Sequence, residues 1–155
     1  MGKEIEHKYL VVGDGYKTLA KSVHHIRQGY LSTEKERTVR VRIYDDKGFI
    51  TVKGANHGYT RLEFEYEIPV ADAENILDEL CLPGSIDKNR YIVDFEGNTW
   101  EVDEFLGALA GLVLAEIELE CSEQSYSKPD FIGKNVTGDS RYYNSNLMNH
   151  RCNDL

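Results

Sequence analysis

The sequence predicts a mainly β (α+β) protein in which about eight antiparallel strands and a few helices form one domain. Most segments alternate charged with apolar residues, a period of two that is typical of strands. Short turn sequences, including Asp45-Asp46-Lys47-Gly48 and Glu96-Gly97-Asn98, separate these segments. Short connections favour antiparallel order. Closure into a barrel would also remove the exposed sheet edges.

The expected strands follow this alternation, and glycine and proline punctuate them. Gly29 lies inside a strand, where glycine often marks a bulge or a close backbone approach. Pro69 indicates that its strand ends at an edge or bends away. We expect strands over residues 3–12, 24–32, 37–44, 49–53, 60–70, 85–95, 99–105 and 112–121.

Helical segments are expected to be few. Residues 16–23 fit a short helix with Asp14 as its N-cap, and residues 71–80 fit a helix with an apolar face. We expect residues 125–134 to form a loop or a short helix, and residues 136–150 to be irregular and then helical.

The bulk composition limits the partners. A chain of 155 residues predicts a single domain over residues 1–155, and 41% hydrophobic content suffices for a core. A net charge of −9 argues against nucleic-acid binding, which needs a basic surface. No apolar run approaches the length of a membrane span. The three cysteines, with no CxxC pair, suggest neither a zinc site nor a disulfide framework and favour a cytoplasmic protein.

The run Glu4-Ile5-Glu6-His7-Lys8 carries the most chemical information. On a strand, residues two apart point to the same face, so Glu4, Glu6 and Lys8 share one side. Such a face can hold a divalent cation on its carboxylates and an anionic oxygen on its lysine. Like-signed pairs with the same spacing recur at Arg40/Arg42, Glu63/Glu65, Lys88/Arg90 and Glu116/Glu118.

Two interpretations of these pairs remain open from periodicity alone. In the first, the charged positions form the solvated outer face of an antiparallel sheet. In the second, they line the inside of a barrel. There, a like-charged pair about 7 Å apart costs about 2.4 kcal/mol at an effective dielectric near 20 unless opposite charges or ligands compensate it. Acidic pairs would suit Mg²⁺ or Mn²⁺, and basic pairs would suit a polyphosphate.

The order of the motifs resembles the CYTH, or triphosphate tunnel metalloenzyme, superfamily, and in particular its small bacterial inorganic triphosphatases. The resemblance covers nearly the whole chain. It is carried by Glu4-x-Glu6-x-Lys8, Arg27-Gln28-Gly29-Tyr30-Leu31, Arg40-x-Arg42, Thr51-x-Lys53, Glu63-x-Glu65-Tyr66-Glu67-Ile68, Lys88-x-Arg90-Tyr91, Glu101-x-Asp103, Ala115-Glu116-Ile117-Glu118 and Asp139-Ser140-Arg141-Tyr142.

The resemblance implies a closed eight-stranded antiparallel barrel whose charged faces line a tunnel and whose apolar faces point outward under helices. It implies metal-site carboxylates at Glu4, Glu6, Asp103, Glu116 and Glu118. It implies a triphosphate cradle of Lys8, Arg40, Arg42, Lys53, Lys88 and Arg90. Lys8 and Tyr30 are the expected catalytic pair, and the roles of Glu63 and Glu65 stay open.

The implied activity is hydrolysis of a triphosphate small molecule with Mg²⁺ or Mn²⁺ as cofactor, most simply of inorganic tripolyphosphate to pyrophosphate and phosphate. The alternatives are a class IV adenylate cyclase, a thiamine or nucleoside triphosphatase, and a non-catalytic polyphosphate-binding module. A non-catalytic binding module would lack some of the metal-binding carboxylates, whereas this chain keeps every expected one. The sequence does not determine the oligomeric state, and a homodimer is the assembly that the resemblance favours.

Overall fold

The computed structural model describes residues 3–57, 60–121 and 123–148, with the side chains of Lys3 and Glu4 outside the described part. The strands, all in one sheet, are β1 (Lys3–Val11), β2 (Ser22–Ser32), β3 (Arg37–Tyr44), β4 (Lys47–His57), β5 (Thr60–Ile68), β6 (Ile86–Phe95), β7 (Asn98–Phe105), β8 (Val113–Glu118) and β9 (Ile132–Asn135). The α-helices are α1 (Tyr16–Leu19), α2 (Val70–Glu79) and α3 (Asn144–Leu147), and η1 (Gly107–Leu109) and η2 (Ser140–Tyr142) are short 3₁₀ turns.

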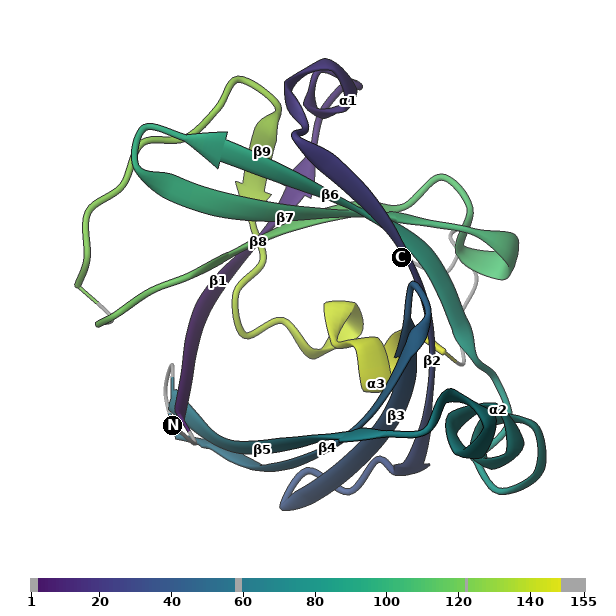
Figure 1. The fold of residues 1–155 in the computed structure, drawn as a ribbon. Coiled ribbons are helices and arrows are strands. Elements are labelled where there is room, and N and C mark those ends of the chain that lie inside the picture. Colours follow the sequence, from purple (N-terminus) through teal and green to yellow (C-terminus); the bar gives the residue numbers. More distant parts are fainter. Residues whose placement is uncertain (1–2, 58–59, 122, 149–155) are drawn as a thin grey trace.

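The sheet closes into the predicted eight-stranded antiparallel barrel (Figure 1). The strand order is β5-β4-β3-β2-β6-β7-β8-β1, and pairing of β1 with β5 completes the ring. The short strand β9 adds to the far side of β1. The predicted fold class is therefore confirmed, and closure leaves the eight barrel strands with neighbours on both sides.

Local turn chemistry explains the tight hairpins. In the β6–β7 turn, Glu96 and Gly97 have φ of 46° and 85°, the positive values that a two-residue hairpin turn requires. The β3–β4 turn is also two residues long, so Lys47 and Gly48, expected in the turn, belong to the strand. A Cβ on Gly29 would lie 3.0 Å from Leu77 of α2, which confirms the predicted close approach.

Several expected boundaries differ from the structure. The helix expected over residues 16–23 ends at Leu19, because Ser22 already pairs with Ile92 in the β2–β6 ladder. The strand expected over residues 49–53 is longer, and the one expected over 112–121 is shorter. Strand β9 was not expected, since its four residues include Gly133 and show no alternation. Residues 149–150 of the predicted C-terminal helix lie outside the described chain.

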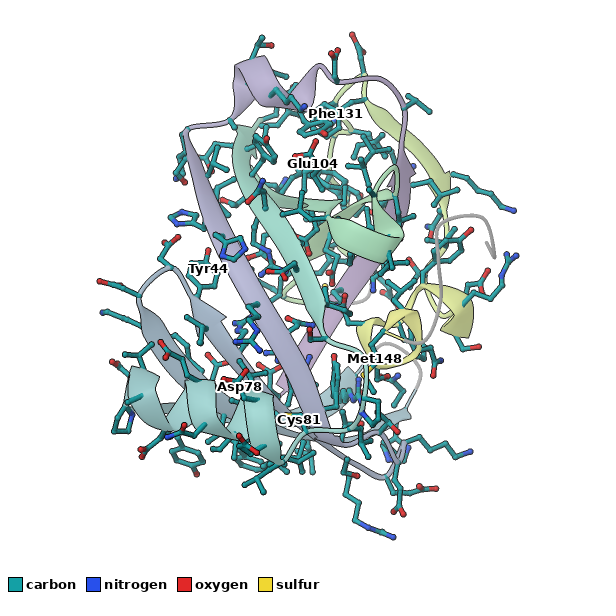
Figure 2. All side chains as sticks on the ribbon, turned by 90° about the vertical axis from the view of Figure 1, so that its right-hand side faces the viewer. Tyr44, Asp78, Cys81, Glu104, Phe131 and Met148 are labelled. Carbon is teal, nitrogen blue, oxygen red and sulfur yellow. The ribbon has the colours of Figure 1, made fainter. Side chains whose placement is uncertain are left out.

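Apolar residues gather in three clusters. Two lie outside the barrel: one surrounds Trp100 and Tyr9, and the other joins α2 to β3 through Ala73, Leu77 and Val41. Figure 2 shows α2, near the labels Asp78 and Cys81, lying across the outside of the barrel. The outward row of β5 is less covered than expected, and Tyr66 keeps 62% of its surface exposed.

The third cluster lies inside the lumen. By strand parity, Phe105 and Leu114 point to the same side as Asp103 and Glu116, yet they pack with Leu147 of α3 in an apolar cluster. Figure 1 shows α3 within the ring of strands. The C-terminal segment therefore fills part of the lumen, and the remaining space is polar.

Candidate functional site

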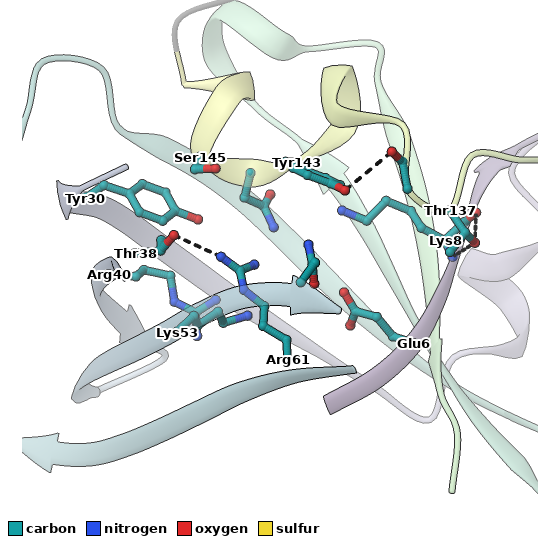
Figure 3. A pocket seen from close by; sticks show the side chains of 13 residues that line it. Glu6, Lys8, Tyr30, Thr38, Arg40, Lys53, Arg61, Thr137, Tyr143 and Ser145 are labelled. Carbon is teal, nitrogen blue, oxygen red and sulfur yellow. Dashed lines mark hydrogen bonds between the residues drawn. The ribbon is translucent and has the colours of Figure 1, made fainter. Parts of the chain in front are cut away.

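The remaining lumen carries two adjoining cavities that differ in charge. The first, which we call the cation-rich cavity, is bordered by Tyr30, Thr38, Asn56 and the C-terminal segment from Thr137 to Ser145 (Figure 3). Its described charged residues are four cations and one carboxylate, namely Lys8, Arg40, Lys53, Arg61 and Glu6.

The second, which we call the carboxylate-rich cavity, shares Glu6, Arg40, Lys53 and Asn144 with the first. Its described charged residues are six carboxylates and four cations: Glu6, Glu63, Glu65, Glu101, Glu116, Glu118, Arg40, Arg42, Lys53 and Arg90. Charges of one sign thus dominate each cavity, which favours a ligand that has both a polyanionic part and a cationic part.

Strand register explains why these residues meet. Across the β1–β8 ladder, Glu6 lies opposite Glu118 and Lys8 lies opposite Glu116. Paired residues in antiparallel strands project from the same face, so these four side chains share the lumen side. The alternation seen in the sequence therefore describes an inward face, which decides between the two interpretations of the charged pairs.

Glu6 and Glu116 lie diagonally on the adjacent strands β1 and β8, and their carboxyls are hydrogen-bonded to each other. Burial raises the pKa of Glu116, but the charge of Lys8, the hydrogen bond from Glu6 and the charge of Arg90 together lower it to about 2. Glu116 is therefore an anion at neutral pH. Adjacent carboxyls of this kind suit a divalent cation that prefers oxygen ligands.

The basic side chains of β3 and β4 pair with carboxylates of β5. Arg40 and Arg42 both approach Glu65, each with an N–O distance of 3.5 Å, and Lys53 approaches Glu63 at 3.1 Å. Glu63 and Glu65, whose roles stayed open, balance the basic residues in this structure. The Nε atoms of Arg40 and Arg42 are buried and have no hydrogen-bond partner among the described residues. An unmade hydrogen bond of this kind costs about 1–3 kcal/mol.

Asp103 occupies a different environment from the other predicted metal ligands. Its carboxylate accepts hydrogen bonds from Arg90 Nε at 2.8 Å and Arg90 Nη2 at 2.9 Å, and Lys88 Nζ lies 2.7 Å away. Burial opposes its ionisation, but these two cations lower the pKa of Asp103 well below its usual range. Its oxygens are thus engaged by the predicted phosphate-binding residues Lys88 and Arg90.

The predicted pair Lys8 and Tyr30 lines the same cavity without a hydrogen bond between the two residues in this structure. Lys8 Nζ donates to the backbone carbonyl of Tyr142 at 2.9 Å. Burial lowers the pKa of Lys8, but Glu116, Glu6 and Asp103 outweigh burial and raise it above its usual value. Lys8 is therefore an ammonium that donates hydrogen bonds.

The predicted site residues whose side chains the structure describes border the two cavities, except Lys88 and Asp103, which pair with each other and reach the site through Arg90. The side chain of Glu4 lies outside the described part. The structure also adds Arg61, Glu101 and the C-terminal segment from Thr137 to Ser145. Parity could have identified two of these additions, since Arg61 shares the face of Glu63 and Glu101 shares the face of Asp103. No sequence signal placed the C-terminal segment in the lumen.

Together, the fold and the two cavities define a class of protein: a closed antiparallel barrel whose lumen binds charged ligands between a basic and an acidic side. A family model described as the CYTH domain matches residues 2–147, and the chain belongs to this family. The resemblance predicted from the motifs is confirmed.

The relatives of this chain bear a consistent name. It is 58% identical to the inorganic triphosphatase of Acetivibrio thermocellus over 96% of this chain and 94% of the relative. It is 34% identical to the inorganic triphosphatase of Nitrosomonas europaea over 93% of this chain and 95% of that protein.

Solved structures agree on the fold. A crystal structure of an inorganic triphosphatase superposes with a TM-score of 0.67 at 31% identity, covering 96% of this chain and 95% of the other. A putative adenylate cyclase from Bacillus halodurans gives a TM-score of 0.62 at 18% identity, over 79% of this chain and 84% of the other. The second likeness shows a shared fold alone. Among the described residues, no helix is long and apolar enough to cross a membrane.

Proposed function

We propose that this chain is a metal-dependent inorganic triphosphatase that hydrolyses tripolyphosphate to pyrophosphate and phosphate. One observation carries the proposal: the buried Nε donors of Arg40 and Arg42 have no partner in the described part of the chain, and both arginines border the same cavity as Glu6, Glu116 and Glu118. A metal-bound polyphosphate supplies oxygen acceptors to the arginines and a cation to the carboxylates, so it satisfies both sides at once. The names of the two relatives support the same activity.

The donor set fits Mg²⁺ or Mn²⁺. Among the described side chains, no three carboxylates converge into a ready-made metal cluster. Mg²⁺ needs no such cage, because it keeps several waters and takes one or two carboxylates together with phosphate oxygens. Glu6, Glu116 and Glu118 would hold the ion, together with Glu4. A bound ion would screen the phosphate charge and lower the pKa of a coordinated water.

The other residues bind and orient the substrate. Arg40, Arg42 and Lys53 neutralise phosphoryl oxygens, and the planar guanidinium groups offer paired donors to them. Lys88 and Arg90 are held in place by Asp103, whose role we propose is to position them. Lys8 Nζ is protonated, and it can exchange its hydrogen bond to the Tyr142 carbonyl for one to a phosphoryl oxygen. The hydroxyl of Tyr30, in the same cavity, orients the attacking water.

The test is a substrate panel with Mg²⁺ and with Mn²⁺. Tripolyphosphate, ATP and thiamine triphosphate are compared by phosphate release, and ATP is also assayed for cyclic AMP. We expect tripolyphosphate to have the highest kcat/KM and chelation by EDTA to abolish turnover. Preferred hydrolysis of thiamine triphosphate or ATP would reassign the substrate. Cyclic AMP with pyrophosphate would make the chain a cyclase, and binding without turnover would make it a polyphosphate-binding module.

Two broader predictions accompany this proposal. A cytoplasmic location fits the free thiols of Cys81 and Cys121, whereas Cys152 lies outside the described residues. The homodimer stays a prediction, which gel filtration with light scattering tests directly.

A further inference from the structure

Arg61 differs from its neighbouring cations in the partners that hold it. Arg40 and Lys53 approach the carboxylates of Glu65 and Glu63. Arg61 instead donates from Nε to the carbonyl oxygen of Gly54 at 2.7 Å and from Nη2 to the hydroxyl of Thr38 at 2.9 Å. No described carboxylate lies within ion-pair distance of Arg61. Among the described side chains, the contacts of Arg61 are therefore with neutral groups.

The two neutral contacts also fix the direction of the guanidinium. Thr38 is buried and donates its own hydroxyl proton to the carbonyl of Glu34 at 3.1 Å, which leaves its oxygen free to accept from Arg61. Figure 3 shows the Arg61 side chain pointing into the cation-rich cavity, beneath Tyr143 and Ser145. The second terminal nitrogen, Nη1, has no described hydrogen-bond partner. Arg61 thus presents a preoriented donor to the cavity.

The charge distribution tells which part of a triphosphate would reach this donor. The carboxylates that would hold a metal, Glu116 and Glu118, border only the carboxylate-rich cavity, whereas Arg61 borders only the cation-rich cavity. A metal-bound diphosphate unit is therefore drawn to the carboxylate-rich cavity. A further phosphoryl group would enter the cation-rich cavity, where the described cations outnumber the carboxylates and the local potential is positive.

We propose that Arg61 is a specificity-determining residue that binds the phosphoryl group farthest from the metal-site carboxylates, so that the site selects a triphosphate over a diphosphate. The inference rests on the proposed function and identifies the residue that distinguishes a triphosphate from a diphosphate. A phosphoryl group at this position completes the hydrogen bonding of the guanidinium with a charge-assisted contact.

The experiment compares the wild-type protein with Arg61→Gln in Mg²⁺, with Arg37→Gln as the matched control. Arg37 points outward by strand parity and pairs with Glu34 in solvent.

The KM for tripolyphosphate is measured with kcat, and pyrophosphate is titrated as a competitive inhibitor. We expect Arg61→Gln to raise KM by about tenfold or more, the usual scale for a lost hydrogen bond between charged groups. The inhibition constant of pyrophosphate should change by less than about twofold, as expected for a contact absent from that ligand.

A second pair of variants keeps the test decisive if Arg61→Gln does not fold. Thr38→Val removes the hydroxyl that orients Arg61 while keeping the guanidinium, and Thr38→Ser retains that hydroxyl. We expect the valine variant to raise KM for tripolyphosphate without weakening pyrophosphate, and the serine variant to stay near wild type.

Two results would overturn the inference. Equal weakening of tripolyphosphate and pyrophosphate would make Arg61 a general contributor to the positive potential. If Arg61→Gln instead needs more Mg²⁺ for activity and keeps the wild-type KM for tripolyphosphate, then Arg61 acts on the metal site through Glu4, its partner in the β1–β5 ladder. Both results leave tripolyphosphate hydrolysis by the wild-type protein intact, whereas an inactive wild-type protein would refute the proposed function itself.

Discussion

Arg90 and Asp103 form a bidentate ion pair across the β6–β7 ladder, with Nε and Nη2 at 2.8 Å and 2.9 Å from the two carboxylate oxygens. Both residues are buried, and Lys88 Nζ completes the group at 2.7 Å from the same carboxylate. Two buried cations therefore share one buried anion, and Arg90 Nη1 also lies 3.3 Å from the more exposed Glu101.

Replacing that anion should destabilise the barrel. We expect Asp103→Asn to lower the free energy of unfolding at pH 7 by about 3–5 kcal/mol, because buried Lys88 loses its ion-pair partner and buried Arg90 keeps only the more exposed Glu101. The measurement is urea denaturation followed by tryptophan fluorescence. Asp94→Asn, which removes an exposed partner of Lys21, is the control and should keep the wild-type midpoint.

The effect of Asp103→Asn should depend on pH with a definite sign. The pKa of Asp103 is lowered in the folded protein, so its ionised form contributes stability above its unfolded pKa near 3.9. That contribution is lost as the pH falls through the folded value. The difference between wild type and variant should therefore be constant from about pH 5 to pH 6, where Lys88 with its pKa lowered to about 8 by burial is still protonated beside Asp103, and shrink below about pH 4. A difference that grows in acid would contradict the ion pair.

Glu116 should be needed for turnover and not for folding. We expect Glu116→Gln to reduce metal-dependent kcat/KM for tripolyphosphate by at least about a hundredfold, because the amide is a weaker cation ligand than the carboxylate. The barrel should remain folded at 25 °C, with a lower thermal midpoint because buried Lys8 loses a counter-charge. Glu120→Gln, on an exposed residue beyond the end of β8, is the control. Full activity of Glu116→Gln would remove this residue from the metal site.

Arg42 should contribute to substrate binding. Burial, together with the charges of Arg40 and Arg90, lowers the pKa of Arg42 to about 10, so the side chain is still protonated at neutral pH. We expect Arg42→Ala to raise KM for tripolyphosphate by about tenfold and to change kcat less. Steady-state kinetics measure both constants, with Arg37→Ala as the control. An unchanged KM would argue against a phosphate contact by Arg42.

Gly48 should be required for the docking of α2. A Cβ at this position would lie 2.8 Å from the Cβ of Ala73 and 3.0 Å from the carbonyl oxygen of Ile68, so the helix would have to move. We expect Gly48→Ala to cost about 1–3 kcal/mol of unfolding free energy, measured by urea denaturation. Gly15→Ala meets no atom within 4 Å and is the control, which should be nearly neutral.

Much of the fold and of the site was predictable because strand parity is a local property. A period of two places Glu6 and Lys8 on one face, and the register of β8 then brings Glu116 and Glu118 to the same side. Parity could not decide which face pointed inward. The family resemblance made that choice, and closure between β1 and β5 confirmed it.

Long-range contacts account for what the sequence did not predict. The C-terminal segment enters the lumen through contacts such as Lys8 Nζ with the Tyr142 carbonyl, which no local pattern encodes. The hydrogen bonds of Asp103 with Arg90 likewise depend on the register of two strands. The motif that resembles a metal-site carboxylate is the same motif that anchors two cations, and geometry alone separates these roles.

Closure of the barrel has a consequence for synthesis on the ribosome. Strand β1 leaves the ribosome first, but its partner β8 is among the last barrel strands to be made. Until Val113–Glu118 is available, one edge of β1 has no barrel partner, and Lys8 lacks the carboxylate of Glu116. We therefore expect a nascent chain that stops before β8 to be catalytically inert and prone to association through that open edge.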